Sequence, residues 1–201
     1  MKKIILIVAA VFAFGFANAQ ENNESSEGFS KGDVFVTGAF SYGSTNNKNN
    51  DEKTSSFEIA PQVNYFVTEN ISLGARIGFA SDMTEVNGTE VQDDSSVAFG
   101  LLGRYYFTPA SKFSLFGQVT AEYATLTQNV VGDPEFKVNG FGASVGLGLN
   151  YFVSSNFSIE ASFAALQFAS AKADVPNAEN VSSFSLGADM SAITFGVNYK
   201  F

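Results

Sequence analysis

The strongest constraint in this sequence is that apolar residues alternate with small or polar residues in eight separate segments. In one of them, Leu73, Ala75, Ile77 and Phe79 alternate with serine, glycine and arginine. A period of two is typical of a β-strand with two different faces, whereas an amphipathic helix repeats every ~3.6 residues. We therefore predict an all-β fold with about eight antiparallel strands of about ten residues each. The segments lie within 34–42, 57–67, 72–79, 97–107, 113–123, 141–151, 157–163 and 193–201.

The connections between these segments alternate in length. Short turns follow Val67, Phe107 and Val153, and long polar segments are expected at 43–55, 81–96, 126–138 and 170–190. Short turns at one end and long loops at the other are typical of an up-and-down barrel that spans a membrane. Residues 65–73 (YFVTENISL) closely match residues 151–159 (YFVSSNFSI), and 105–115 repeat the unit with two extra residues. Aromatic residues concentrate at the end of the barrel with the short turns. This predicts an aromatic girdle at the membrane interface, formed by Tyr65, Tyr105, Tyr106, Tyr151 and Tyr199.

The first nineteen residues have the layout of a secretory signal peptide. Lys2 and Lys3 precede an uncharged apolar run, and Ala17-Asn18-Ala19 supplies the small residues of a cleavage site after Ala19. The apolar run of about 13 residues is too short for a membrane-spanning helix, which needs about 20. We expect residues 20–31 to form a polar, mobile tail and residues 32–201 to form the barrel.

Alternation alone does not say which face of the barrel is outside. A soluble barrel that carries an apolar ligand would turn the apolar face inward. Here one face is rich in glycine, serine, asparagine and glutamine with charges of both signs, while the other is apolar and aromatic in all eight segments. A narrow polar lumen inside a lipid-facing wall fits this distribution best, and a secreted chain without a long apolar helix can enter a membrane only as a barrel.

The composition excludes several classes of function. The chain has no cysteine and no histidine, so it lacks thiolate chemistry, the usual general base at neutral pH and the commonest metal ligand. We predict no catalytic, cofactor-binding or metal-binding residues, and therefore no enzyme. A net charge of −9 with 11 scattered lysines and arginines gives no surface suited to nucleic acid.

Two groups of charged residues stand out. The first is predicted to face the lumen as a carboxylate–guanidinium network, since buried charges need partners. Its members are Glu58, Arg76, Arg104, Glu122 and Glu160. The second group makes the expected loop 81–96 acidic. We interpret it as a solvated surface loop, and the alternative is a loop that binds a divalent cation. Its members are Asp82, Glu85, Glu90, Asp93 and Asp94.

The last segment, 194–201 (TFGVNYKF), resembles the C-terminal assembly signal of outer-membrane barrels, with Thr194, Gly196, Tyr199 and Phe201 at its defining positions. Together with the signal peptide and the hairpin layout, the chain resembles the OmpA/OmpX-type family of small eight-stranded outer-membrane barrels over residues 32–201. The resemblance implies that both termini and the short turns face the periplasm and the long loops face outward. It also implies recognition by the barrel assembly machinery.

We expect a non-enzymatic, monomeric barrel in contact with outer-membrane lipid and lipopolysaccharide, with a structural or surface-interaction role through its loops. A small-solute pore is the alternative, disfavoured because eight strands leave no open channel. A secreted soluble carrier of an apolar ligand is the third interpretation.

Two places depart from the strand pattern. Pro61 should cause a local bulge, since it cannot donate a ladder hydrogen bond. Near 184–192, Phe184 and Leu186 have the opposite parity to Ile193, which predicts a bulge near Ser191 or a loop.

Overall fold

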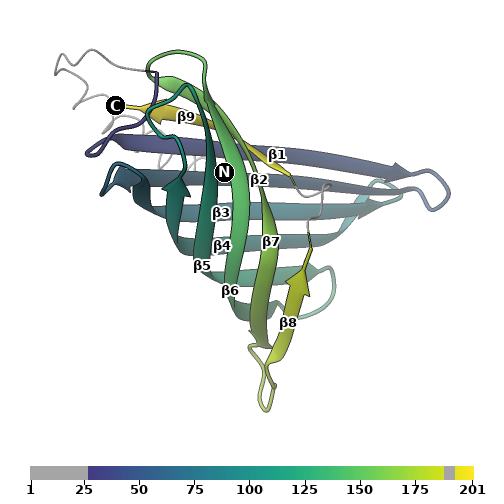
Figure 1. Cartoon of the computed structure of the whole chain (residues 1–201). Coiled ribbons are helices and arrows are strands. Elements are labelled where there is room, and N and C mark those ends of the chain that lie inside the picture. Colours follow the sequence, from purple (N-terminus) through teal and green to yellow (C-terminus); the bar gives the residue numbers. More distant parts are fainter. Residues whose placement is uncertain (1–26, 188–192) are drawn as a thin grey trace.

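The computed structural model describes residues 27–187 and 193–201, and these residues form an antiparallel β-barrel (Figure 1). The predicted signal peptide lies outside the described residues. No helix within the described part is long and apolar enough to cross a membrane. The strands are β1 (Val34–Asn47), β2 (Glu52–Phe66), β3 (Ile71–Val86), β4 (Thr89–Tyr106), β5 (Phe113–Val130), β6 (Phe136–Phe152), β7 (Phe157–Ala173), β8 (Val181–Leu186) and β9 (Thr194–Lys200).

The sheet closes into a ring in which eight strand positions surround the lumen. From β1 to β7 each strand pairs with the next, and β9 completes the ring by pairing with both β7 and β1. Strands β8 and β9 lie along the same edge of β7, where β9 pairs with Phe157–Ser162 and β8 pairs with Leu166–Ala171. The prediction of an eight-stranded antiparallel barrel is thus confirmed, with the eighth position shared by two short strands.

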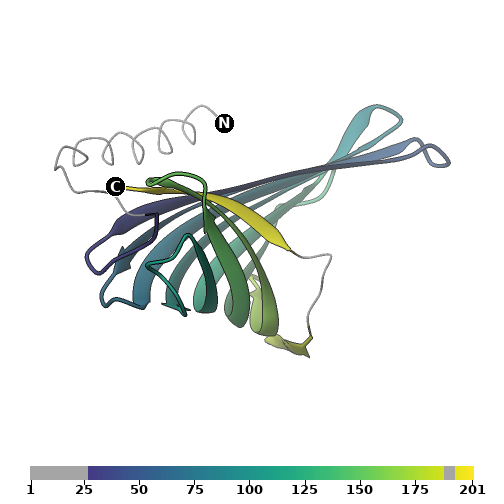
Figure 2. The same ribbon diagram turned by 45° about the horizontal axis from the view of Figure 1, so that its top comes forward.

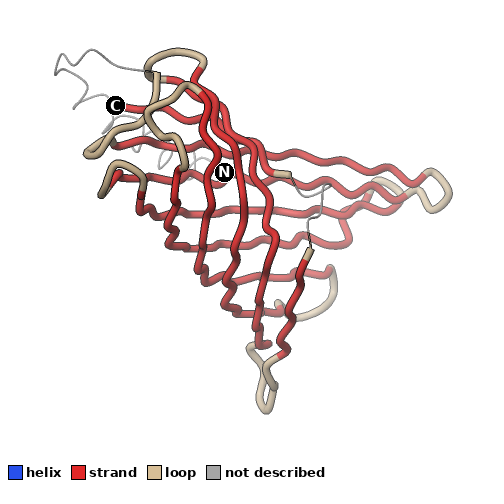
Figure 3. Tube along the Cα trace, viewed as in Figure 1, coloured by secondary structure: helices blue, strands red, loops and turns tan. Residues whose placement is uncertain are grey.

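The two ends of the barrel differ. We call the end with the short turns 67–70, 107–112 and 153–156 the turn end, and the opposite end the hairpin end. At the hairpin end the strands run on for several residues beyond the predicted limits, so that the expected loops 43–55, 81–96 and 126–138 are largely paired strand. The hairpins splay apart there, as Figures 2 and 3 show. The β3–β4 hairpin turns at Asn87-Gly88, both with positive φ, as a type I′ two-residue turn requires.

The repeated sequence unit is explained by the way the turns bond to the next strand. In the first copy, the Thr68 hydroxyl accepts a hydrogen bond from the Ile71 amide at 2.9 Å, and the Asn70 side chain donates to the Tyr106 carbonyl at 2.9 Å. In the second copy, the Ser154 hydroxyl accepts from the Phe157 amide at 3.2 Å, and Asn156 donates to the Lys200 carbonyl at 2.8 Å. The shared threonine or serine and asparagine therefore close each turn and attach it to its neighbour.

The predicted bulge at Pro61 is wrong. Ile59 pairs with Phe79 and Gln62 pairs with Arg76, so the same number of residues separates the two pairs on each strand. Pairing with β3 lapses at Pro61, since proline has no amide hydrogen, but the register is kept.

A bulge occurs instead in β7. Gly146 pairs with Ala164 and its neighbour Val145 pairs with Leu166, which leaves Ala165 as the extra residue. The bulge reverses the parity of the strand, so that Leu166 and Phe168 continue the outward apolar row that runs from Phe157 to Phe163. Strand β8 follows this new parity, with Leu186 opposite Leu166 and Phe184 opposite Phe168. This accounts for the parity of Phe184 and Leu186, while the predicted bulge near Ser191 lies outside the described residues.

The outer face of the barrel is apolar and the inner face is polar. Large apolar side chains on the outside are strongly exposed, such as Leu101 (69%) and Phe99 (58%), whereas Asn64, Asn150 and Asn198 are buried inside. This is the reverse of a soluble barrel and the arrangement that a lipid environment requires. The apolar residues therefore form a lipid-facing wall.

Candidate functional site in the barrel lumen

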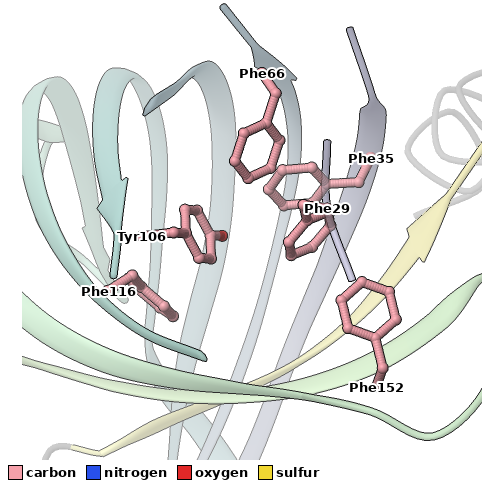
Figure 4. Close-up of a cluster of buried hydrophobic side chains, with 6 residues drawn as sticks. All are labelled: Phe29, Phe35, Phe66, Tyr106, Phe116 and Phe152. Carbon is pink, nitrogen blue, oxygen red and sulfur yellow. The ribbon is translucent and has the colours of Figure 1, made fainter. Parts of the chain in front are cut away.

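The lumen is closed at the turn end by a cluster of buried aromatic rings, which we call the aromatic floor (Figure 4). Phe29 lies in its centre, with ring centroids 4.7 Å from Phe35, 4.8 Å from Phe152 and 4.9 Å from Phe66. Tyr106, which the sequence analysis assigned to the outer girdle, is fully buried in this floor. That part of the girdle prediction is wrong. The floor consists of Phe29, Phe35, Phe66, Tyr106, Phe116 and Phe152.

The segment before β1 is held in place by hydrogen bonds to two parts of the chain. The Phe29 amide donates to the Pro109 carbonyl at 2.7 Å, and the Lys200 ammonium donates to the Gly28 carbonyl at 2.6 Å. A Cβ at position 28 would collide with the backbone of Ala110, so the close approach needs glycine there. The described part of the expected mobile tail, from residue 27, is therefore docked against the barrel, and Phe29 points into it.

A layer of charged and polar side chains lies next to the aromatic floor. The Arg104 guanidinium donates to both Glu160 oxygens, at 2.8 and 3.0 Å, and its Nε donates to Gln118 at 2.6 Å. Asn198 donates to Glu160 at 3.0 Å, and the Arg104 guanidinium stacks 4.5 Å from the Phe116 ring centroid. Because nearly every donor and acceptor of this buried pair is used, its charges are compensated in a low-dielectric site.

The other predicted lumen charges lie further toward the hairpin end. Arg76 Nε is 3.4 Å from Glu122 Oε2, and both side chains are about 30% exposed. Glu58 is exposed and forms no ion pair within the described part of the chain. The five predicted residues therefore form two separate pairs and one single carboxylate instead of one network.

Between the Arg104–Glu160 layer and the hairpin end lies a cavity of about 520 Å³, which we call the outer chamber. Its polar lining includes Gln62, Arg76, Thr120, Ser144 and Thr194. A volume of this size is typical of a small-molecule site.

The expected acidic loop is the β3–β4 hairpin in the structure. Asp82 pairs with Asp94, Met83 with Asp93, and Glu85 with Glu90 across the two strands. No group of three or more acidic residues that could hold a metal ion occurs in the described parts of the chain.

The residues of the proposed assembly signal all lie in or directly after β9. Gly196 faces the lumen, where a Cβ would approach Glu160 and Thr37 at 3.1 Å. Tyr199 faces outward, with ring centroids 4.9 Å from Phe157 and 4.9 Å from Phe201. Thr194 lines the outer chamber.

The chain matches the family described as outer membrane protein beta-barrel domain over residues 6–201. Among solved structures, it is similar to the outer membrane protein OprG from Pseudomonas aeruginosa, with 15% identity, 88% of this chain and 99% of that chain covered, and a TM-score of 0.55. It is also similar to Neisserial surface protein A (14%, 84% and 97%, TM-score 0.54) and to the N-terminal barrel of P. aeruginosa OprF (16%, 86% and 100%, TM-score 0.53). These identities support the fold alone. No curated protein matches the chain.

Proposed function

Because the chain belongs to the family of outer membrane protein beta-barrel domains, we propose that it is a non-enzymatic barrel that conducts no solutes and presents its hairpins outside the cell. The observation that carries this proposal is the closure of the lumen at the turn end. Phe29, Phe35 and Phe66 are at most 1% exposed, and the Arg104–Glu160 pair lies directly beside the floor. A pore would need a continuous polar path, which the packed rings interrupt.

The long strands at the hairpin end support a role at the cell surface. Beyond Phe79 and Val97 the outward positions of β3 and β4 become polar, at Ser81 and Ser95 among others. The strands therefore extend past the apolar band, and the hairpins stand in water. With the turn end toward the periplasm, these hairpins are the surface available to lipopolysaccharide or to partners outside the cell.

The remaining sequence-based expectations belong to the same proposal. A signal peptide is removed after Ala19, the barrel assembly machinery recognises β9 and Phe201, and the barrel is a monomer. A non-enzymatic role follows from chemistry, since the chain has neither histidine nor cysteine to act as base or nucleophile.

Surface labelling tests the orientation. The chain has no cysteine, so a single Gly88→Cys variant reports on the β3–β4 hairpin and a matched Ser155→Cys variant reports on the turn end. On intact cells, a membrane-impermeant maleimide should label position 88 and not position 155. Labelling of position 155 alone would overturn the orientation.

Conductance tests the closed lumen. The refolded barrel in a planar lipid bilayer should give no stepwise currents. Reproducible unitary currents from the unaltered protein would overturn the proposal and favour a pore.

A further inference from the structure

The charged groups that line the outer chamber differ in how far their bonding capacity is used. Arg104 and Glu160 are joined by two hydrogen bonds of 2.8 and 3.0 Å, and Asn198 donates a further bond to Glu160. Glu58 and Arg76 also line the chamber and are not engaged in this way. A molecule in the chamber would therefore meet Glu58 and Arg76 as the charged groups that can still bind it.

Arg76 keeps unused hydrogen-bond donors. Its Nε lies 3.4 Å from Glu122 Oε2, whereas neither terminal nitrogen donates a hydrogen bond within the described part of the chain. The Arg76 stem crosses Gly100 so closely that a Cβ there would lie 2.9 Å from Arg76 Cγ. Nη2 lies 3.9 Å from the Cβ position of Gly78, which is two residues nearer the hairpin end. A planar guanidinium with free terminal nitrogens matches the two oxygens of a carboxylate.

Glu58 supplies the opposite charge on the neighbouring strand. Arg76 pairs with Gln62, and Glu58 lies four residues from Gln62 toward the hairpin end. An even spacing keeps both charged side chains on the inner face, with about 13 Å of strand between their positions. Glu58 is exposed, and no ion pair joins it to Arg76 or to another described residue. Its carboxylate is therefore available to a cationic group such as an ammonium.

The chamber has room for a ligand that reaches both charges. Its volume is about 520 Å³, and Gln62, Thr120 and Ser144 add amide and hydroxyl groups to the lining. The aromatic floor closes the turn end, while the exposure of Glu58 shows that water reaches the chamber from the hairpin side. A ligand with one charge would leave Glu58 or Arg76 without a partner, whereas a molecule with an ammonium and a carboxylate matches both.

We propose that the outer chamber binds a short peptide with both termini free, which enters from the hairpin end. The peptide carboxylate bonds to the terminal nitrogens of Arg76, and the peptide ammonium bonds to Glu58. Three extended residues span up to about 10 Å, which suits the separation of the two charged positions. This inference goes beyond the proposed function and rests on it only for the side from which the peptide arrives.

Ligand-detected NMR tests the binding. Trialanine titrated against the refolded barrel in lipid nanodiscs should give a saturable saturation-transfer signal from its methyl groups. N-acetyl-trialanine and trialanine amide each lack one charged terminus, and each should bind about tenfold more weakly because a charge-assisted bond is lost. Equal affinity of the free peptide and of either blocked peptide would overturn the proposal.

Matched substitutions assign each terminus to its partner. Glu58→Gln should weaken trialanine about tenfold and leave N-acetyl-trialanine unchanged, because the acetylated peptide has no ammonium to lose. Arg76→Gln should likewise weaken trialanine and leave the amide unchanged. Glu90→Gln removes an exposed carboxylate of β4 outside the chamber lining, and should change neither affinity. Equal effects of Glu58→Gln and Glu90→Gln, or an equal loss for free and acetylated peptide, would overturn the assignment.

This inference and the proposed function fail on different results. Migration of the unboiled sample in SDS shows whether the barrel is folded. A folded, non-conducting barrel that gives no saturable signal with trialanine would overturn the inference and leave the proposed function intact. Unitary currents would overturn the proposed function, and the dependence of binding on Glu58 and Arg76 would still be measurable in the same protein.

Discussion

The two ion pairs of the lumen use the same residue types but differ in every physical respect. Arg104 and Glu160 are 2% and 6% exposed and meet at 2.8 Å, while Arg76 and Glu122 are 28% and 30% exposed and meet at 3.4 Å. The first pair lies against aromatic rings and has additional bonds to Gln118 and Asn198. The outer chamber is lined by Arg104 and Glu160 of the first pair and by Arg76 of the second. The comparison teaches that burial and complete hydrogen bonding, and not residue type, decide how much an ion pair contributes to stability.

The largest effect is expected from breaking the buried pair. Arg104→Met should lower the free energy of unfolding by about 3–5 kcal/mol, because it leaves Glu160 buried without its partner. The matched change in the outer half, Arg76→Met, should cost less than about 1 kcal/mol because its pair is partly hydrated. Urea titration of the barrel in lipid vesicles measures both.

The double variant Arg104→Met/Glu160→Leu serves as a control for the first comparison. It should recover most of the lost stability, since no unpaired charge remains. Equal losses for Arg104→Met and Arg76→Met would show that the two halves of the lumen do not differ.

Removing the central ring of the aromatic floor should have the next largest effect. Phe29→Ala deletes a ring that contacts Phe35, Phe66 and Phe152, and should cost about 3 kcal/mol through lost burial and the cavity that remains. The measurement is the temperature at which the protein loses its folded band in SDS electrophoresis, which should be lower for Phe29→Ala than for the unaltered protein. Phe99→Ala, a change on the lipid-facing wall, should have a smaller effect, and the reverse order would contradict a structural role for the floor.

A smaller effect is expected where a glycine lies against the floor. A Cβ at position 148 would overlap the Phe116 ring, so Gly148→Ala should cost about 1–3 kcal/mol through overpacking. Gly117 lies on the neighbouring strand with nothing within 4 Å of its Cβ position, so Gly117→Ala should change stability by less than about 0.5 kcal/mol. Urea midpoints of the two variants should separate, and coincident midpoints would mean that the floor tolerates rearrangement.

The smallest effect on the barrel is expected at the hairpin end. Gly88 has a φ of +74°, so Gly88→Ala should strain the turn by about 1 kcal/mol. The strain should stay local, raising the rate of protease cleavage at the hairpin and leaving the urea midpoint unchanged. Thr89→Ala is the control that should alter neither. A lowered midpoint for Gly88→Ala would show that the hairpin contributes to the stability of the whole barrel.

The alternation of residues predicted the barrel and the sidedness of its strands because every pair of neighbouring positions reports on two faces. It did not predict where the strands end toward the outside. Outside the membrane both faces of a hairpin are in contact with water. The polar stretch 81–96 therefore has the composition of a loop, although its residues form paired strands. The Asn87-Gly88 dipeptide is a local signal for a tight hairpin and could have located that turn.

The partners within the lumen were beyond sequence reasoning because they depend on register. Arg104 and Glu160 are 56 residues apart and meet only when the tilt and the order of strands β4 to β7 are fixed. Phe29 was missed for a different reason. A single apolar residue in an acidic stretch carries no period, and its partners come from β1, β2, β4 and β6.

The bond between Lys200 and Gly28 has a consequence for the order of folding. The two residues are 172 positions apart, and β1 meets its second neighbour only when β9 is in place. Pairs of consecutive strands are local contacts that form early, whereas joining the two ends carries the entropy of closing a very long loop. We therefore expect the docking of Phe29 and the bond from Lys200 to Gly28 to form late, so that an unfinished barrel stays unsealed at its turn end.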